Sequence, residues 1–291
     1  MLLRQCLKAD AVLVQKRLLS PVQFWLLRCV SRVLLFDFDD AIHLRQQNGR
    51  SEISKGRLHK FNRTIKGCDY IFAGNRILAS MASPLNPRVE IIPSAVSVKD
   101  TPQKDYTRPV NKSVVIGWIG TEVNLPYLTL LAPTLLRLSE TYNIELRIIC
   151  SHAIEIPNLR VNFIPWQLET QEQEIAQFDI GLMPLPDSEH ASGKCGYKAL
   201  QYMAAAVPTV ASDVGINSEI IRDKKEGILV KNIEGFYSAL KFLIEEPSAR
   251  QRIGLAGRAR VEQDYSIEVV GKQLADAIKK AIKTHHEEKN R

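Results

Sequence analysis

The sequence predicts an α/β protein built from parallel sheets in two domains. The first observation is its length of 291 residues, about twice that of a usual single domain. The second is that short apolar stretches suited to buried strands alternate with longer stretches that have helical periodicity. The third is that the strand segments are continuous apolar runs, which is typical of parallel sheets covered by helices on both faces.

The first part of the chain predicts four strands and three helices. The strands are expected at residues 11–15, 32–37, 69–74 and 89–92, and the helices at residues 20–31, 51–66 and 75–82. Ser20 and Pro21 have the residue types of a helix N-cap and a first helical position. Residues 96–111 are polar, contain two prolines and predict an interdomain linker. The predicted domains are therefore residues 1–106 and 107–291.

After the linker the alternation starts again and predicts a second, larger sheet. Its strands are expected at residues 114–119, 145–150, 161–164, 178–183, 209–211 and 227–230. Its helices are expected at residues 125–141, 169–177, 196–206, 217–223, 233–246, 249–264 and 267–284. This order of strands and helices is that of a nucleotide-binding α/β domain with additional C-terminal helices.

The composition excludes several classes of protein. Apolar residues make up 45% and charged residues 24%, which excludes a disordered chain, a collagen-like repeat and a coiled coil. The positive charge is distributed unevenly along the chain, because residues 1–110 contain 18 lysines and arginines and only 9 acidic residues. That excess indicates an anionic partner, such as a membrane surface or a phosphorylated lipid, and a solvated basic face is an equal alternative. No nucleic-acid recognition motif accompanies it, so no nucleic-acid partner is expected.

The cysteines and the apolar segments predict the compartment. Five scattered cysteines without C-x-x-C spacing argue for a reducing compartment and against a disulfide framework or a zinc cluster. No stretch approaches the roughly 18–20 apolar residues that span a bilayer, and the N-terminus does not resemble a signal peptide. We expect a cytoplasmic protein, with a peripheral position on the inner face of the membrane as a further expectation.

Two segments have the residue types of a phosphate site. Residues 116–121 end a strand in glycines and turn toward a helix, so that Gly117, Gly120 and Thr121 would bring backbone N–H groups close to an anion. A plain tight turn explains the same pattern. Residues 192–198 precede a helix and place Lys194 and Lys198 four residues apart, so that both could face one anion. A capped helix with two solvated lysines is the alternative.

A third segment carries three carboxylates where a strand ends. Asp37, Asp39 and Asp40 follow the strand predicted at residues 32–37, and ligands of open α/β sheets bind at the carboxyl ends of strands. The carboxylates could bind a metal ion, hold sugar hydroxyl groups or orient a loop. Turn or cap residues are an equal alternative, and only His43 is near in sequence as a further metal ligand. No metal site is therefore predicted.

Taken in order, several segments resemble a known enzyme family. Residues 117–121, 179–185, 193–198, 201–205 and 207–212 resemble the C-terminal half of the retaining GT-B glycosyltransferases of the group 1 family, which is similar to glycosyltransferase family 4. The resemblance covers residues 113–282, and residues 33–41, 68–75 and 91–94 resemble the N-terminal half. It implies two Rossmann-like domains, of which the C-terminal one binds a nucleoside diphosphate sugar and the N-terminal one an acceptor.

The resemblance also implies roles for individual residues. Gly120 and Thr121 match the loop near the donor diphosphate, and Gly196 and Tyr197 match the amides that meet the phosphate. Gly193 and Gln201 stand at the two glutamate positions of the family's E-x7-E motif, and Trp166 lies where the base packs. The family's usual arginine after the glycine loop is replaced by Thr121, and Lys194 or Lys198 would supply the missing charge. Asp39 and Asp40 are expected to face the donor sugar. The implied catalytic set is Asp39, Asp40 and Lys194.

The implied reaction is transfer of a sugar to a lipid-linked, polysaccharide or other glycan acceptor, with retention of configuration and without a metal ion or other cofactor. The first βαβ units of the family's N-terminal domain are not visible in the sequence, so that domain is expected to be incomplete. Together with the two missing glutamates, this leaves open a truncated, non-catalytic protein that binds nucleotide sugar, or a partner-dependent subunit. A nucleotide-sugar 2-epimerase is a further alternative, for which a fuller set of catalytic side chains would be expected.

Overall fold

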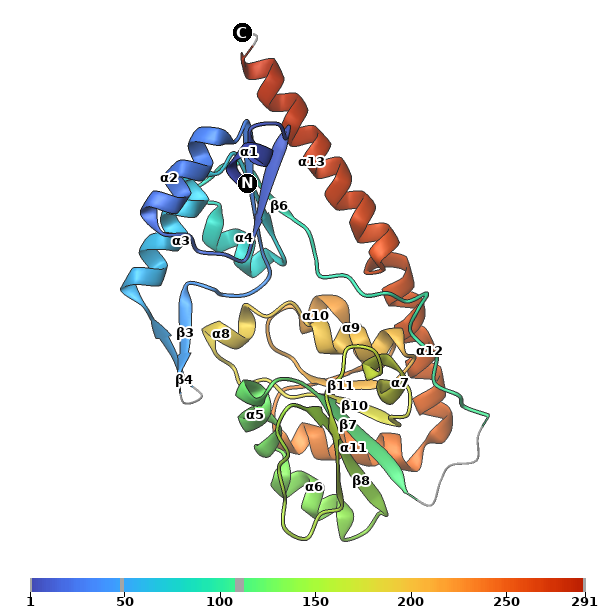
Figure 1. Cartoon of the computed structure of the whole chain (residues 1–291). Coiled ribbons are helices and arrows are strands. Elements are labelled where there is room, and N and C mark those ends of the chain that lie inside the picture. The colour runs from blue at the N-terminus through green and yellow to red at the C-terminus, as the bar shows by residue number, and fades with distance from the viewer. Residues whose placement is uncertain (1, 48–49, 108–112, 290–291) are drawn as a thin grey trace. The chain divides into compact units, whose positions relative to one another are not determined.

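The computed structural model describes residues 2–47, 50–107 and 113–289, and its chain forms two compact units (Figure 1). Unit 1 comprises residues 1–94, 188–195 and 268–291, and unit 2 comprises residues 95–187 and 196–267. Both units contain a parallel sheet covered by helices, so the predicted α/β class with two parallel sheets is confirmed. The units are discontinuous along the chain, in contrast to the predicted linear division at residue 106.

Unit 1 holds a four-stranded parallel sheet in the order β1-β2-β5-β6. Its strands are β1 (Ala11–Gln15), β2 (Val33–Phe38), β5 (Tyr70–Ala73) and β6 (Val89–Ile91), all of them predicted. Its helices are α1 (Leu2–Cys6), α2 (Pro21–Val30), α3 (Lys55–Gly67), α4 (Arg76–Ala82), α8 (Glu189–Ser192) and most of α13 (Ile267–Lys289). The carboxyl ends of all four strands lie at one edge of this sheet, because the strands are parallel.

Local sequence explains how the first helix begins. The side-chain oxygen of Ser20 accepts a hydrogen bond from the backbone N–H of Gln23, and the Gln23 side chain accepts one from the backbone N–H of Ser20. Pro21 occupies the first turn, where its missing N–H costs nothing. Phe24 and Leu27 then point inward and pack with Phe36 of β2 and Phe61 of α3. The predicted N-cap is therefore confirmed.

One predicted helix of unit 1 is partly wrong. The expected helix at residues 51–66 begins only at Lys55, because residues up to Ile53 form the antiparallel pair β3 (Leu44–Gln47) and β4 (Arg50–Ile53). Register pairs Leu44 with Ile53 and Gln47 with Arg50. In this short polar segment, helical periodicity alone does not show where β4 ends and the helix begins.

Unit 2 has six parallel strands in the order β12-β11-β10-β7-β8-β9. They are β7 (Val114–Ile119), β8 (Ile144–Cys150), β9 (Val161–Pro165), β10 (Ile180–Met183), β11 (Thr209–Ser212) and β12 (Ile228–Val230). Its helices are η1 (Glu122–Asn124), α5 (Leu125–Thr129), α6 (Ala132–Ser139), α7 (Gln171–Ile175), α9 (Tyr197–Ala204), α10 (Asn217–Ile220), α11 (Ile233–Glu245) and α12 (Pro247–Asp264). The chain starts at β7, winds outward to β9, and returns through β10 to the other edge, which is the Rossmann strand order.

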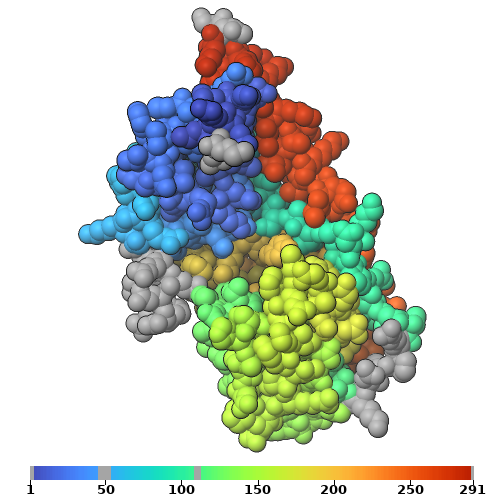
Figure 2. Space-filling view, viewed as in Figure 1, coloured from blue at the N-terminus to red at the C-terminus, as the bar shows by residue number. Residues whose placement is uncertain are grey.

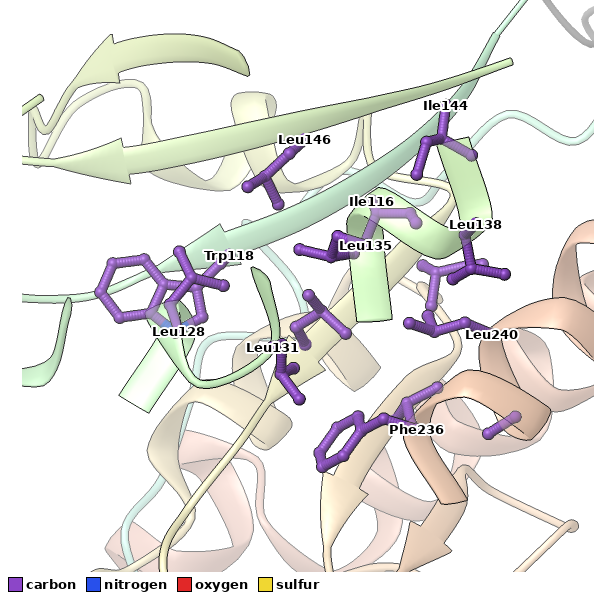
Figure 3. Close-up of a cluster of buried hydrophobic side chains, with 14 of the residues drawn as sticks. Ile116, Trp118, Leu128, Leu131, Leu135, Leu138, Ile144, Leu146, Phe236 and Leu240 are labelled. Atoms are coloured by element: carbon purple, nitrogen blue, oxygen red, sulfur yellow. The ribbon is translucent and has the colours of Figure 1, made fainter. Parts of the chain in front are cut away.

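The side chains of β7 alternate between two cores of unit 2. Ile116 and Trp118 point into the cluster beneath α5, α6 and α11, shown in Figure 3 with Leu128, Leu135 and Leu240. Val115 and Ile119 point to the opposite face, toward α7 and α9. This alternation follows from the two-residue period of a strand, and it buries β7 on both faces.

The expected helix at residues 125–141 is broken into α5 and α6. The first piece ends at Thr129, Leu131 is the N-cap of the second, and Pro133 stands in the first turn of the second. Proline provides no N–H to continue the hydrogen-bond ladder of the preceding helix, so a new helix starts there. Leu128, Leu131 and Leu135 nevertheless pack into one core, as they would on a single amphipathic helix.

The described part of residues 96–111 packs along unit 2, so the predicted free linker is wrong for these residues. Val96 and Val98 are buried, and the Arg258 guanidinium donates hydrogen bonds to the carbonyl oxygens of Val98 and Thr101. The Tyr106 hydroxyl donates to the Ala206 carbonyl at 2.8 Å. Residues 108–111 of that segment lie outside the described residues.

Among the described helices, none combines the length and apolarity required to cross a bilayer.

Candidate functional site

The candidate donor site is the carboxyl edge of the unit 2 sheet, between β7 and β10. Strand order reverses at this point, since β8 lies on one side of β7 and β10 on the other. β7 and β10 pair only over Ile116 with Ile180 and Gly117 with Gly181, and beyond this the two strands separate. Ligands of doubly wound sheets bind in the crevice that such a reversal opens.

Tyr202 connects β7 and β10 where the two strands separate. Its fully buried hydroxyl accepts a hydrogen bond from the Ile119 N–H at 3.0 Å and donates one to the Leu182 carbonyl at 3.1 Å. The two backbone groups that the diverging strands leave unpaired are thereby satisfied. Tyr202 therefore holds the ends of β7 and β10 at a fixed separation. Sequence analysis missed this residue, because an aromatic side chain on an apolar helix face looks like ordinary core.

Glycines let the elements of this edge come close together. A Cβ atom on Gly117 would lie 2.0 Å from the Phe178 ring, so this glycine makes room for core packing. A Cβ atom on Gly120 would lie 2.6 Å from the Trp118 ring and 2.7 Å from the Lys198 Nζ. The backbone at Gly120 thus lies directly beside the Lys198 ammonium group. The predicted donor roles of Gly117 and of Thr121, which follows Gly120, stay predictions.

The start of α9 contributes positive charge at this edge. Gly196 precedes the helix in a left-handed conformation with φ 67°, and it provides no side-chain cap for the N–H groups of the first turn. Tyr197 and Lys198 are the first helical residues, and the Lys198 Nζ lies 4.3 Å from the centroid of the Trp118 ring. Orphan N–H groups and the helix dipole favour an anion at such an end. A lysine there adds to the same field, so the arrangement is suited to a phosphate.

A polar network lies at the predicted base and ribose positions. The Gln171 side-chain oxygen accepts a hydrogen bond from the Trp166 indole N–H at 3.0 Å and one from the Gln201 amide at 3.4 Å. Trp166 remains half exposed, and Gln201 is buried. Two residues predicted separately are therefore connected through Gln171, which the sequence did not single out. Because Gln171 begins a short helix 30 residues before Gln201, no local motif marks it.

The carboxyl edge of the unit 1 sheet holds the predicted carboxylates. Register pairs Gln15 with Asp37, and the Gln15 amide donates a hydrogen bond to the Asp37 carboxylate at 3.0 Å. The Lys16 Nζ lies 2.6 Å from the Asp39 Oδ2. Among the described residues, the Asp40 side chain has no hydrogen bond, and the Asp39 Oδ1 is buried without a hydrogen-bond partner. Both carboxylates therefore have oxygen atoms left for a ligand.

Asp40 and Lys194 influence each other across this edge. Burial raises the pKa of the Asp40 carboxyl, and the Lys194 ammonium group lowers it against that trend. Burial likewise raises the pKa of Asp37, which the hydrogen bond from Gln15 counteracts. The structure thus brings the three predicted catalytic residues, Asp39, Asp40 and Lys194, into one group in unit 1. Their catalytic role stays a prediction.

Asn75 fixes the segment that carries Lys194. Its side-chain NH2 group donates to the carbonyl oxygens of Gly193 at 3.2 Å and Lys194 at 3.4 Å, and lies 3.3 Å from the Cys195 Sγ. Gly193 packs on Ala41, where a Cβ atom would come within 2.9 Å of the alanine methyl group. Gly193 is therefore a packing residue of unit 1. Asn75 was missed, because the contacts that give it this role span about 120 residues of sequence.

The spacing of Lys194 and Lys198 is not a helical one. Lys194 follows α8 and belongs to unit 1, whereas Lys198 lies in the first turn of α9 and belongs to unit 2. The left-handed Gly196 separates them. The two lysines therefore do not lie on one helix face, and each is described within its own unit. That both could face one anion stays a prediction.

A cavity of about 730 Å³ lies at another place in unit 2. Lys104, Tyr106, Val115 and Asp179 line it, and the last two precede or begin strands, which places it at the amino edge of the sheet. Its Lys104 pairs with Asp179 at 2.9 Å, so these charges are already balanced within the protein. The candidate donor site is therefore placed at the carboxyl edge, where Lys198 and the start of α9 lie, and not at this cavity.

Part of the chain is similar in sequence to a known family. Residues 113–246 match the family described as "Glycosyl transferases group 1". Glucosyltransferase 3 of Streptococcus parasanguinis is 26% identical over 107 residues, which cover 36% of this chain and 32% of that protein. Alpha-maltose-1-phosphate synthase of Mycobacterium tuberculosis is 33% identical over 93 residues, covering 29% of this chain and 24% of that protein. The chain thus spans about a third or less of the curated relatives it matches.

Solved structures resemble nearly the whole chain. Sucrose-phosphate synthase from Thermosynechococcus elongatus has a TM-score of 0.73 at 13% identity, covering 95% of this chain and 75% of that one. Anabaena Alr3699/HepE in complex with UDP and glucose has a TM-score of 0.76 at 12% identity, covering 96% of this chain and 80% of that one. These likenesses confirm the α/β fold with two Rossmann-like parallel sheets.

Proposed function

We propose that this chain, whose residues 113–246 match the group 1 glycosyltransferase family, transfers a sugar from a nucleoside diphosphate sugar to a glycan or lipid-linked acceptor. The observation that carries the proposal is the position of Lys198. Its ammonium group lies beside the Gly120 backbone at the strand-order reversal and in the first turn of α9, to which Gly196 provides no side-chain cap. A diphosphate is the ligand that this combination of charge and donors suits best.

The proposed reaction uses this positive charge on the leaving group. Negative charge accumulates on the diphosphate as the bond to the sugar breaks, and donors already aimed at it stabilise the transition state. Lys198 and the first amides of α9 supply those donors in unit 2. In unit 1, the Asp40 carboxylate would face the sugar or the attacking hydroxyl, with Lys194 maintaining its ionised form. Retention of configuration, and a reaction without a metal ion, belong to the proposal as implications of the family resemblance.

The acceptor side of the proposal includes an anionic membrane surface. On α2, Trp25 is 63% exposed and Val22 is 65% exposed, and α3 carries five lysines and arginines and no acidic residue. Exposed apolar side chains beside cationic ones suit the interface of a membrane that contains anionic lipids. This supports a lipid-linked acceptor more than a soluble one.

A binding protein without transfer activity is the second candidate. Gly193 and Gln201 occupy the positions where the family has two glutamates, and the structure gives both of them contacts within the protein. Gly193 packs on Ala41, and the Gln201 amide is engaged by Gln171. Recognition of the donor sugar by these two positions is thereby reduced, which favours retention of nucleotide binding over retention of catalysis.

Two measurements on the full chain test the proposal. Excess UDP or GDP should raise the melting temperature by several degrees, because a ligand that binds only the folded state stabilises it. UMP should raise it much less, because it lacks the second phosphate. UDP-glucose incubated with the protein and a lipid extract should then release UDP. Absence of any shift with UDP, GDP or ADP would contradict the donor site, whereas a shift without release would favour the binding protein.

A further inference from the structure

A small basic pocket lies where the first strand of unit 1 ends. It has a volume of about 330 Å³ and is lined by Lys16, Arg17, Leu18, Leu19, Gln23, Arg57 and Lys60. The capping box of α2 shapes one wall, because it fixes how the chain enters that helix after β1. The other wall is the first part of α3. In the space-filling view, the residues around β1 and α2 in blue adjoin the lighter blue α3 segment (Figure 2).

The lining of this pocket has one sign of charge. Lys16, Arg17, Arg57 and Lys60 are four of its seven residues, and none of the seven is acidic. Cations held this close repel one another unless an anion lies among them. The first turn of α3 contains no acidic residue either, and Ser54 makes no side-chain hydrogen bond there, so the helix dipole adds to the positive field.

Among the described residues, three of the four cations of the pocket are not neutralised by ion pairs. The Arg57 Nε–H donates to the Ile42 carbonyl at 2.8 Å, which orients the guanidinium group without neutralising it. Arg17 and Lys60 form no ion pair within the described residues. Lys16 alone has a carboxylate partner, Asp39. A pocket with several unneutralised donors, including two guanidinium groups, matches the geometry of phosphate oxygens.

Lys16 connects the pocket to the candidate catalytic carboxylates. It follows β1 in a left-handed conformation with φ 55°, which is uncommon for a residue with a side chain. Its ammonium group reaches Asp39, the neighbour of Asp40, at the same edge of the sheet. Burial lowers the pKa of Lys16, but the hydrogen bond to Asp39 and the negative charges of the three aspartates at this edge together outweigh burial, so the pKa is raised overall. The lysine therefore stays charged.

From this arrangement we infer that the pocket binds a phosphate group of the acceptor and thereby aligns the acceptor with Asp39 and Asp40. The inference rests on the proposed function, in which unit 1 receives the acceptor. The volume is near the lower limit of ligand pockets and suits a phosphate head rather than a whole glycan. The phosphate could belong to a lipid headgroup or to a soluble phosphorylated acceptor, since both present the same oxygens.

Titration of the full chain in the presence of saturating UDP tests this inference, because UDP keeps the donor site of unit 2 occupied. Inorganic phosphate and pyrophosphate should bind and release measurable heat. Replacing Arg17 and Lys60 together (Arg17→Gln with Lys60→Gln) should weaken that binding by about a hundredfold, since each charged hydrogen bond contributes about tenfold. The matched control is Arg4→Gln with Lys8→Gln, which removes the same charge from α1 and the turn that follows it, and should change the affinity little.

A second arm identifies the source of the phosphate. Vesicles of phosphatidylcholine with phosphatidic acid should bind the wild type but not the Arg17/Lys60 variant if the source is a lipid. Binding of inorganic phosphate or pyrophosphate without vesicle binding would assign a soluble acceptor. If neither probe binds, or if the Arg17/Lys60 variant binds as the wild type does, the inference is overturned. UDP binding is measured separately, so failure of the donor site would be recognised independently.

Discussion

Replacing Asp40 with asparagine is expected to lower the rate of sugar transfer about a hundredfold or more, which is the range of a lost acid–base or charge-stabilising group. Neither side-chain oxygen of Asp40 is hydrogen-bonded among the described residues, whereas the Asp39 Oδ2 pairs with Lys16, and the Lys194 charge acts on Asp40. Asn has nearly the same shape but no charge. UDP affinity should be unchanged in this variant, because the donor residues belong to unit 2. The rate is measured as release of UDP from UDP-glucose with the lipid extract.

The matched control is Asp37→Asn. The Asp37 carboxylate accepts a hydrogen bond from the Gln15 amide within the protein, so we expect this variant to lose less than about tenfold in rate. Equal losses in both variants would show that the cluster acts on folding and not on transfer. Full activity of Asp40→Asn would remove this carboxylate from the mechanism.

The raised pKa of Asp40 adds a pH dependence. Because burial raises the pKa of this carboxyl, the transfer rate should fall on acidification at a pH above the ordinary aspartate value of 3.8. The folded state favours the neutral form of such a group, so ionised Asp40 destabilises the fold above its folded pKa. The free energy of unfolding of Asp40→Asn at neutral pH should therefore equal or exceed that of the wild type. A less stable variant would contradict this assignment.

Replacing Lys198 with glutamine is expected to weaken UDP binding about tenfold to a hundredfold, because it removes a charged donor at the proposed diphosphate. Gln retains most of the chain length over the Trp118 ring but not the ammonium group. Affinity is measured by calorimetry. Lys225→Gln is the control, since it removes one exposed lysine from the other end of the unit 2 sheet, before β12, and should leave the affinity unchanged.

Lys198→Arg separates charge from geometry in the same experiment. Arginine keeps the positive charge and the contact with Trp118, but its larger group must fit beside the Gly120 backbone. We expect an affinity between those of the wild type and Lys198→Gln. Wild-type UDP affinity in Lys198→Gln would assign the diphosphate to other residues.

Much of the fold could be predicted because local pattern and tertiary packing agree. Apolar runs such as residues 114–119 are buried on both faces, so their continuous hydrophobicity marks a parallel strand. The start of α2 at Ser20 and Pro21 is a local hydrogen-bond pattern that sequence displays directly. Where local signals conflict or are weak, as at residues 51–66 and 125–141, the elements were misjudged.

The candidate sites were predictable only in part, for a physical reason. Asp39, Asp40 and Gly120 stand at strand ends, and a parallel sheet brings such positions to one edge, so sequence order alone places them. Lys194 and Asn75 meet across more than a hundred residues, and no periodicity encodes that contact. Tyr202 serves the site through its hydroxyl while its ring lies in the core, and residue type alone does not distinguish these roles.

Hydrogen exchange of the full chain with and without saturating UDP tests the central claim most directly, because it locates the nucleotide within unit 2. The account predicts slower exchange at residues 118–121 and 196–201, which form the carboxyl edge at the start of α9. It predicts no change at residues 102–106, 176–177 and 179, which line the cavity of about 730 Å³ at the amino edge. Protection at the amino edge alone, or none at either edge under saturating UDP, would contradict the proposed donor site.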